Sequence, residues 1–197
     1  DGHRNDDQNP YVFVTNDYGQ SWRSISANLP EGSVYVVRED YINPDLLFAG
    51  TEFSIFVSLD RGRSWDRFMN NFPTVPVHDL YIHPRDGDLI AGTHGRGAWI
   101  ADNITPLQQM GNVADDVHLF DVRPTTQWKS MYEWGFITQK TFTGDNPPAG
   151  SQISYFLRNQ AQGPAEIEIL DIRGNVIRTI EGSSDAGINS VQWNFRG

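Results

Sequence analysis

The sequence predicts an all-β protein in two parts, the last blades of a β-propeller followed by an immunoglobulin-like β-sandwich. Three observations predict this fold. A motif recurs after about 43 residues, no stretch before residue 105 has a helical period, and short alternating apolar runs separated by turns fill roughly the last 80 residues. The repeat period is that of one four-stranded propeller blade.

The composition is that of a folded chain, and it argues against some classes of binding partner. The 197 residues fit one large domain or two small ones, and 6 Trp, 7 Tyr and 11 Phe argue against disorder. A formal net charge of -10 argues against nucleic acid and anionic membranes. No apolar run approaches the roughly 18 residues that span a bilayer. The absence of cysteine excludes disulfides, thiolate zinc sites and a cysteine nucleophile.

The first part is predicted to consist of strands repeated from blade to blade. Residues 34–38 and 77–82 are β-rich runs, each followed by a proline turn at 43–45 or 83–88. Residues 46–50 and 89–92 come next, then 54–58 and 97–100. We therefore expect two blades and part of another within residues 1–105.

Residues 11–22 and 54–65 share the pattern Ser/Thr-x-Asp-x-Gly-x-x-Trp, known as the Asp box. We expect each aspartate to accept hydrogen bonds from backbone N–H groups of its own turn, each glycine to supply a positive φ, and each tryptophan to pack under the turn. A third copy keeps the aspartate but has Ile104 and Leu107 in place of glycine and tryptophan. The predicted structural set is Thr15, Asp17, Gly19, Trp22, Ser58, Asp60, Gly62, Trp65 and Asp102.

The second part begins after a connector at residues 106–118. Apolar-alternating runs at 119–120, 153–157, 167–170, 176–180 and 191–195 predict strands in residues 119–197, and Arg173-Gly174-Asn175 predicts a tight hairpin. An aromatic cluster precedes most of these runs. It could be a sugar-binding platform or the contact between the two parts, and it comprises Trp128, Tyr132, Trp134 and Phe136.

Several longer segments carry a family resemblance, at residues 1–4, 37–40, 50–53, 73–79 and 92–99, and then at 145–155, 169–180 and 193–196. The first group resembles the last blades of bacterial exported proteins with bacterial-neuraminidase-type (BNR) repeats, the sortilin-like propellers often labelled glycosyl hydrolases. The second group is similar to the C-terminal immunoglobulin-like module of flagellar hook-capping proteins. The resemblance implies a periplasmic, cell-surface or extracellular location.

The resemblance also implies that the family propeller has more blades upstream and that the module continues further. We therefore expect the chain to be a fragment with a truncated module. Its open strand edges are expected to be covered by remaining blades or by another protein chain.

Blade topology predicts where a ligand would bind. The Asp-box turns and the proline turns lie at one end of a blade, and the loops joining second and third strands lie at the other, near the central funnel of a propeller. Those loops, at residues 1–10, 52–54 and 94–97, carry the candidate ligand-binding residues His3, Arg4, Asp6, Asp7, Glu52, His94 and Arg96. The arginines could bind an anionic sugar or a peptide terminus, or could pair with the loop acids to hold the loops.

The leading functional hypothesis is ligand recognition, of a peptide or a glycan, or scaffolding in a surface assembly. The alternative is a sialidase-like or endo-glucanase-like glycoside hydrolase whose catalytic groups lie largely in missing blades. No residue of this chain is assigned a catalytic role and no cofactor is expected. Calcium at Asp1, Asp6 and Asp7 and zinc at His3 and His94 are formal options. His78, His83 and His118 are assigned ordinary surface or strand roles.

Overall fold

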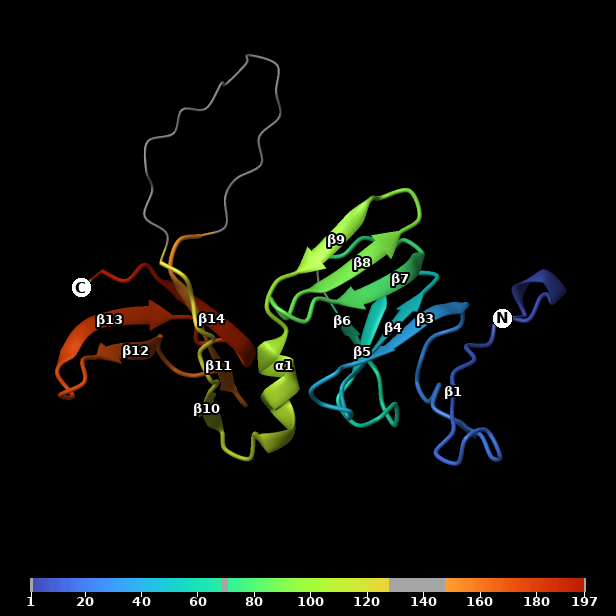
Figure 1. Ribbon diagram of the computed structural model, residues 1–197, viewed down its shortest axis with the longest axis horizontal. Coiled ribbons are helices and arrows are strands. Elements are labelled where there is room, and N and C mark those ends of the chain that lie inside the picture. The colour runs from blue at the N-terminus through green and yellow to red at the C-terminus, as the bar shows by residue number, and fades with distance from the viewer. Residues whose placement is uncertain (1, 69–70, 128–147, 197) are drawn as a thin grey trace, which may run out of the picture. The chain divides into compact units, whose positions relative to one another are not determined.

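The described part of the chain folds into antiparallel sheets with one short α-helix, so the all-β prediction is confirmed (Figure 1). The computed structural model describes residues 2–68, 71–127 and 148–196. The chain divides into two compact units, unit 1 at Asp1–Val113 and unit 2 at Ala114–Gly197. In the described residues no helix is long and apolar enough to cross a membrane.

The described residues of unit 1 form three sheets of unequal size. Strands β1 (Phe13–Val14) and β2 (Arg23–Ser24) form a two-stranded sheet. The second sheet is four-stranded, with strands in sequence order: β3 (Val34–Glu39), β4 (Leu47–Thr51), β5 (Ile55–Ser58) and β6 (Asp66–Phe68). The third is three-stranded: β7 (Val77–Ile82), β8 (Leu89–Thr93) and β9 (Ala98–Ala101). Only the middle repeat is therefore a complete four-stranded blade among the described residues.

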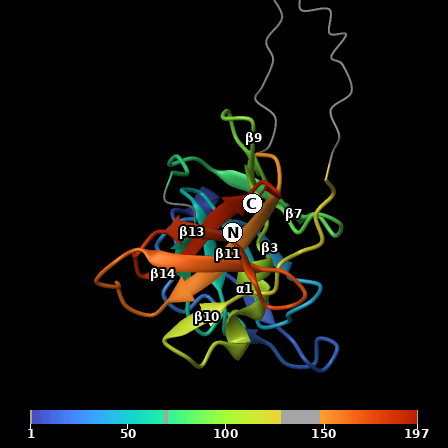
Figure 2. The ribbon, with the colours of Figure 1, turned by 90° about the vertical axis from the view of Figure 1, so that its left-hand side faces the viewer.

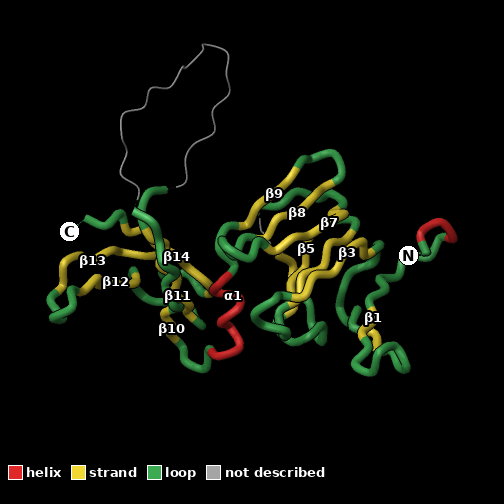
Figure 3. The backbone as a smooth tube through the Cα atoms, viewed as in Figure 1, coloured by secondary structure: helices red, strands yellow, loops and turns green. Residues whose placement is uncertain are grey.

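Helical segments are few and short (Figure 3). A 3-10 turn spans His3–Asn5, α1 spans Thr105–Gln109, and a second 3-10 turn spans Met110–Asn112. Pro106 in the first turn of α1 is favourable because the N–H group that proline lacks has no partner at a helix start. The side chain of Ile104, just before α1, is buried in the apolar core at 2% exposure. At the position where the two earlier motifs have a glycine in a turn, the chain thus has an isoleucine packed in the core.

The core of unit 1 lies between neighbouring sheets. Every residue of β4 is buried, because strands pair with both of its edges and sheets cover both of its faces. Leu47 and Ala49 face the two-stranded sheet, and Phe48 belongs to the cluster shared with the three-stranded sheet. An added Cβ on Gly50 would lie 2.7 Å from Val36 and 2.8 Å from Val77. Glycine is thus required at this close approach between the two sheets.

The described residues of unit 2 form two small sheets, and Figure 2 labels the strands β10, β11, β13 and β14. Strands β10 (Val117–Leu119), β11 (Ser151–Leu157) and β14 (Gly187–Trp193) form one sheet in the order β10-β11-β14. Strands β12 (Ala165–Leu170) and β13 (Val176–Gly182) form a hairpin. Phe120, Ile153, Tyr155 and Leu157 are buried. This arrangement is consistent with a β-sandwich.

The hairpin turn of unit 2 lies at the predicted position. Asp171 accepts hydrogen bonds from the backbone N–H groups of Arg173 at 2.7 Å and Asn175 at 2.9 Å. Gly174 has a φ of 85°, which the turn requires. The aromatic cluster at residues 128–136 lies outside the described residues.

Candidate ligand-recognition site

Two turns of unit 1 with the same sequence pattern contain the same hydrogen bonds. In the first, the Thr15 hydroxyl accepts from the Gly19 N–H at 2.8 Å and donates to the Asp17 carboxylate at 2.8 Å. The Ser21 N–H and hydroxyl donate to Asp17 at 2.9 and 2.5 Å. In the second turn the corresponding distances are 2.8, 2.7, 2.9 and 2.6 Å, between Ser58, Asp60, Gly62 and Ser64. Each carboxylate is therefore used to close its own turn.

Backbone conformation and electrostatics also match between the two turns. Tyr18 and Gly19 have φ values of 57° and 88°, and Arg61 and Gly62 have 59° and 77°. The hydrogen bonds from the side chain and backbone of Ser21 lower the pKa of Asp17 to about 2. Asp102, expected to mark a third turn, is exposed and accepts none of the equivalent hydrogen bonds among the described residues.

The two tryptophans that follow these turns differ. Trp65 is 2% exposed, as expected for a residue packed under a turn, whereas Trp22 is 62% exposed. The expectation that both pack in the same way was therefore wrong for Trp22. Trp65 packs against Ile25 and Leu29, which follow β2, and no segment among the described residues covers Trp22 in the same way.

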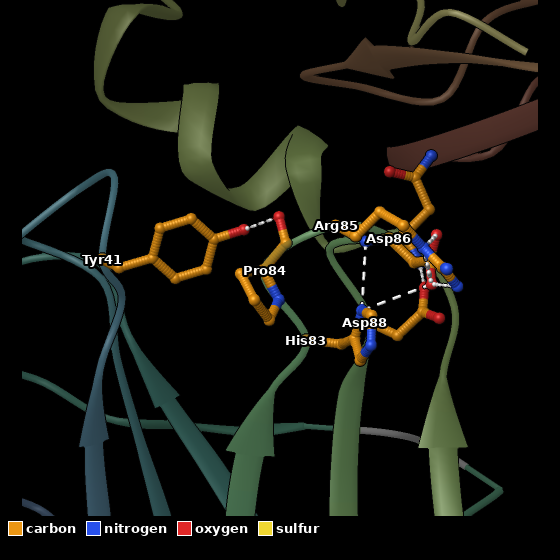
Figure 4. Close-up of polar contacts among 7 residues, drawn as sticks. Tyr41, His83, Pro84, Arg85, Asp86 and Asp88 are labelled. Carbon is orange, nitrogen blue, oxygen red and sulfur yellow. Dashed lines mark hydrogen bonds and ion pairs between the residues drawn. The ribbon is translucent and has the colours of Figure 1, made fainter.

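The end of unit 1 that carries these turns is closed by polar contacts between its own loops. The β5–β6 turn and the β3–β4 turn are joined by an ion pair between Arg61 and Asp45. Figure 4 shows the Tyr41 hydroxyl donating to the backbone oxygen of Pro84 at 2.9 Å, which joins the β3–β4 turn to the β7–β8 turn. Within the latter turn Arg85 pairs with Asp86 at 2.6 Å (Figure 4). Several polar groups of the turns at this end are therefore bonded to one another.

Backbone hydrogen bonds tie together the loops at the opposite end of unit 1. The Gly32 N–H donates to the Gln8 oxygen at 2.7 Å, and the Glu52 N–H donates to the Ser33 oxygen at 2.9 Å. In the next sheet the His94 N–H donates to the Pro76 oxygen at 2.9 Å. These bonds hold the loops between the second and third strands beside the connections that lead into β3 and β7.

Three aromatic rings form a continuous stack at this second end. Tyr35 and His78 occupy β-bulges at the same place in β3 and β7, and their ring centroids lie 4.5 Å apart with planes inclined by 17°. His94 follows β8 and stacks on His78 at 5.5 Å and 28°. Bulges change the direction of a side chain, which explains how rings from separate strands meet. We call Tyr35, His78 and His94 the ring column.

An ion pair fixes the two strands that carry the ring column. Arg38 on β3 donates through Nε to the Leu80 oxygen at 2.6 Å and through a terminal nitrogen to Asp79 at 2.8 Å. Both charged side chains are exposed, at 48% and 69%, so the pair contributes little to stability. The contacts of Arg38 instead fix the position of β3 beside β7.

The structure places the predicted site residues in different loops of unit 1. His94 is part of the ring column, and Glu52 occupies the position equivalent to His94 in the preceding sheet. Asp7 accepts from Tyr11 at 2.6 Å, and this bond lowers the pKa of the Asp7 carboxyl. Arg4, Asp6 and Arg96 are exposed, as is His94. His3 lies in the first 3-10 turn, and Asp1 lies outside the described residues.

The described part of the chain shows no ion pair between Arg4 or Arg96 and the acids Asp6, Asp7 and Glu52. The interpretation that these arginines hold the loops by pairing therefore gains no support. Nor do the described residues contain a group of three His, Asp or Glu side chains placed to hold a metal ion.

Sequence reasoning missed Tyr35 and His78. A signal existed, because they are 43 residues apart and each follows a valine that begins the first strand of its sheet. His78 was assigned an ordinary strand role, and it does lie on β7, but it is also the middle ring of the column.

Comparison with known families agrees with this architecture. A family model, Sortilin-Vps10 (Sortilin, neurotensin receptor 3), matches residues 10–111. No curated protein matches the chain in a sequence comparison. The matched segment covers more than half of the chain and contains all three sheets of unit 1 together with the ring column. The chain therefore belongs to the Sortilin-Vps10 family.

Proposed function

We propose that unit 1 recognises a ligand, a glycan or a peptide, at the end of its sheets that carries the ring column. The family description names a receptor, which supports recognition over catalysis. A ligand-recognition role also requires polar and aromatic side chains that remain accessible to a ligand.

One observation carries the proposal: the ring column and an exposed arginine, Arg96, occur together, because Arg96 lies in the loop that also holds His94. Tyr35, 36% exposed, and the exposed His78 and His94 present ring edges that both donate and accept hydrogen bonds. Arg96 is exposed in the loop that also holds His94. At the opposite end Arg61 pairs with Asp45 and Arg85 pairs with Asp86.

The two ligand classes use different parts of this surface. A neutral glycan would place sugar hydroxyls on the ring edges and an apolar ring face on the column. A peptide terminus or an acidic sugar would add a carboxylate, for which the planar guanidinium of Arg96 or Arg4 is the natural partner. For a neutral glycan, affinity should depend on the ring column alone. For a peptide terminus or an acidic sugar, affinity should depend on the ring column and an arginine.

The test follows the imidazole signals of the histidines by NMR during titration with two probes. The probes are a neutral oligosaccharide of β-linked glucose and a short peptide with a free terminal carboxylate. We expect the signals of His78 and His94 to shift while His83, at the opposite end, stays unchanged. His78→Ala should weaken binding by about fivefold, because a stacked aromatic pair contributes ~1 kcal/mol.

His83→Ala is the matched control and should leave affinity unaltered. Shifts confined to His83, or equal losses of affinity in both variants, would contradict the proposed location. Arg96→Gln should reduce affinity for the carboxylate-bearing peptide and leave affinity for the neutral oligosaccharide unchanged.

A further inference from the structure

Two loops of unit 1 join second and third strands in neighbouring sheets, and their backbone N–H groups are bonded differently. The first loop, residues 52–54, follows Thr51. The Glu52 N–H donates to a backbone oxygen at 2.9 Å. The N–H groups of Phe53 and Ser54 both donate to the Thr51 hydroxyl, at 3.3 and 3.2 Å. Every N–H group of this loop therefore has an acceptor within the fold.

The equivalent loop of the next sheet, residues 94–97, lacks the second kind of acceptor. Thr93 takes the place of Thr51, since each ends its strand in the sequence Ala-Gly-Thr. The Thr93 hydroxyl donates to the Gly97 oxygen at 2.7 Å. The first N–H group of the loop donates to a backbone oxygen at 2.9 Å, as in the first loop. Within the described part of the chain, the N–H groups of residues 95–97 have no acceptor.

Two carbonyl oxygens of the same loop, in contrast, are bonded to the fold. The Gly97 oxygen accepts from the N–H of Thr93 at 3.1 Å as well as from its hydroxyl. The Arg96 oxygen accepts from the indole N–H of Trp99 at 3.2 Å. Trp99 packs edge-on against Phe72, with 5.4 Å between ring centroids. The loop is thus held through its carbonyl groups, and its N–H groups are available to a ligand.

Two glycines give this loop its backbone conformation. Gly95 and Gly97 have φ values of 85° and 70°, whereas Arg96 between them has no positive φ. No atom lies within 4 Å of a Cβ built on either glycine, so the backbone conformation and not crowding requires glycine here. Turns of this kind bring successive N–H groups to one side, where they form a concavity that binds anions.

The side chain of Arg96 adds a matching charge to these N–H groups. Arg96 is exposed and takes part in none of the ion pairs of the described residues. The chain has 25 acidic and 15 basic residues, yet residues 93–97 contain no acid. A guanidinium can donate two parallel hydrogen bonds to an oxyanion. The loop is therefore a positive site within an acidic protein.

We propose that residues 95–97 bind a tetrahedral oxyanion, the sulfate or phosphate group of a ligand. Three backbone N–H groups and the two donors of a guanidinium fork exceed the roughly four acceptor sites of a carboxylate. A sulfate or phosphate group has more acceptor sites and can engage all of these donors. We call residues 95–97 the anion loop.

The anion loop adjoins the ring column, because His94 precedes it and stacks on His78. Assignment of the oxyanion to a recognised ligand rests on the proposed recognition role, which it deepens by naming one chemical group of that ligand. Binding of the oxyanion itself depends only on the loop. The two proposals can therefore fail separately.

The test follows the backbone amide signals of the full chain by NMR during titration with sodium sulfate, sodium phosphate or sodium acetate at constant ionic strength. We expect the amide protons of residues 95–97 to move downfield with sulfate and phosphate, because an N–H group that donates to an anion is deshielded. The amides of Phe53 and Ser54 should stay unchanged, since Thr51 already accepts from them. Acetate should bind about tenfold more weakly, because it leaves at least one donor unmatched.

Arg96→Gln should weaken sulfate binding by about tenfold, through loss of a charge-assisted hydrogen bond. Arg63→Gln is the matched control, because Arg63 is an exposed arginine of the β5–β6 turn, and it should leave sulfate binding unchanged. Equal losses in the two variants would show a general charge effect and overturn the proposal. Amides of residues 95–97 that respond to neither sulfate nor phosphate, or equally to acetate, would also overturn it.

Glucose 6-sulfate and glucose 6-phosphate distinguish the two sources of the oxyanion, because the ester that binds more tightly identifies the group. A third comparison separates the anion loop from the recognition role. If the oligosaccharide or the peptide shifts the signals of His78 and His94 while no oxyanion shifts those of residues 95–97, the anion loop is wrong and the recognition role stands. If the oxyanions shift residues 95–97 while neither probe shifts the histidines, the anion loop stands and the recognition role is wrong.

Discussion

At the scale of single residues, the aspartates of the two repeated turns should make the stability of unit 1 depend on pH. Hydrogen bonds lower the pKa of Asp17 to about 2. For Asp60 burial raises the pKa, but hydrogen bonds from Ser64 and Ser58 outweigh it, so the pKa is lowered as well. A lowered folded-state pKa means that the stabilisation is present above the unfolded pKa of about 4 and is lost as pH falls toward 2.

The measurement is the denaturant midpoint of unfolding between pH 5 and 2. The natural chain should lose stability over this range, and Asp60→Asn should flatten the profile. Asp66→Asn is the control, since Asp66 is exposed on β6 and lies outside the turn. A profile for Asp60→Asn that parallels the natural chain would show that the turn carboxylate is not responsible.

Residue-scale prediction worked where the chemistry is local. The hydrogen bonds of Asp17 and Asp60 span four residues, so their pattern can be read along the chain. The ring column could not be read in this way, because Tyr35 meets His78 only when two bulged strands from different sheets lie side by side. Exposure of Trp22 was missed for a similar reason, since burial depends on a neighbouring repeat.

At the scale of elements, helix α1 is anchored to the four-stranded sheet by a buried polar contact. Gln108 of α1 donates to the Asp40 carboxylate at 2.7 Å, and the backbone N–H groups of Ile42 and Asn43 bond the other carboxylate oxygen. Asp40 is 3% exposed and Gln108 is 8% exposed. A helix of only five residues has no readable period, so its position could not be predicted from sequence.

Gln108→Ala should therefore destabilise unit 1 by ~1–3 kcal/mol, because it leaves a buried carboxylate oxygen without its donor. Chemical denaturation measures the loss. Gln20→Ala provides the matched control, since Gln20 is an exposed glutamine of the same unit and should have little effect. Equal stability of the two variants would show that α1 is not held by this contact.

At the scale of the whole molecule, the apolar clusters of unit 1 are formed by its own residues. One cluster includes Val36, Phe48, Val77 and Leu107, and the other includes Val12 and Trp65. All of these residues precede the division at Val113. Because a domain with its own core can fold by itself, residues 1–113 should fold when unit 2 is removed.

The prediction is tested by comparing residues 1–113 with the full chain. We expect Trp65 to show the same solvent protection in both proteins, and the short chain to unfold in one cooperative transition. The full chain should show that same transition together with a second one from unit 2. Exposure of Trp65 in the short chain, with loss of cooperative unfolding, would mean that the three sheets need unit 2 to fold.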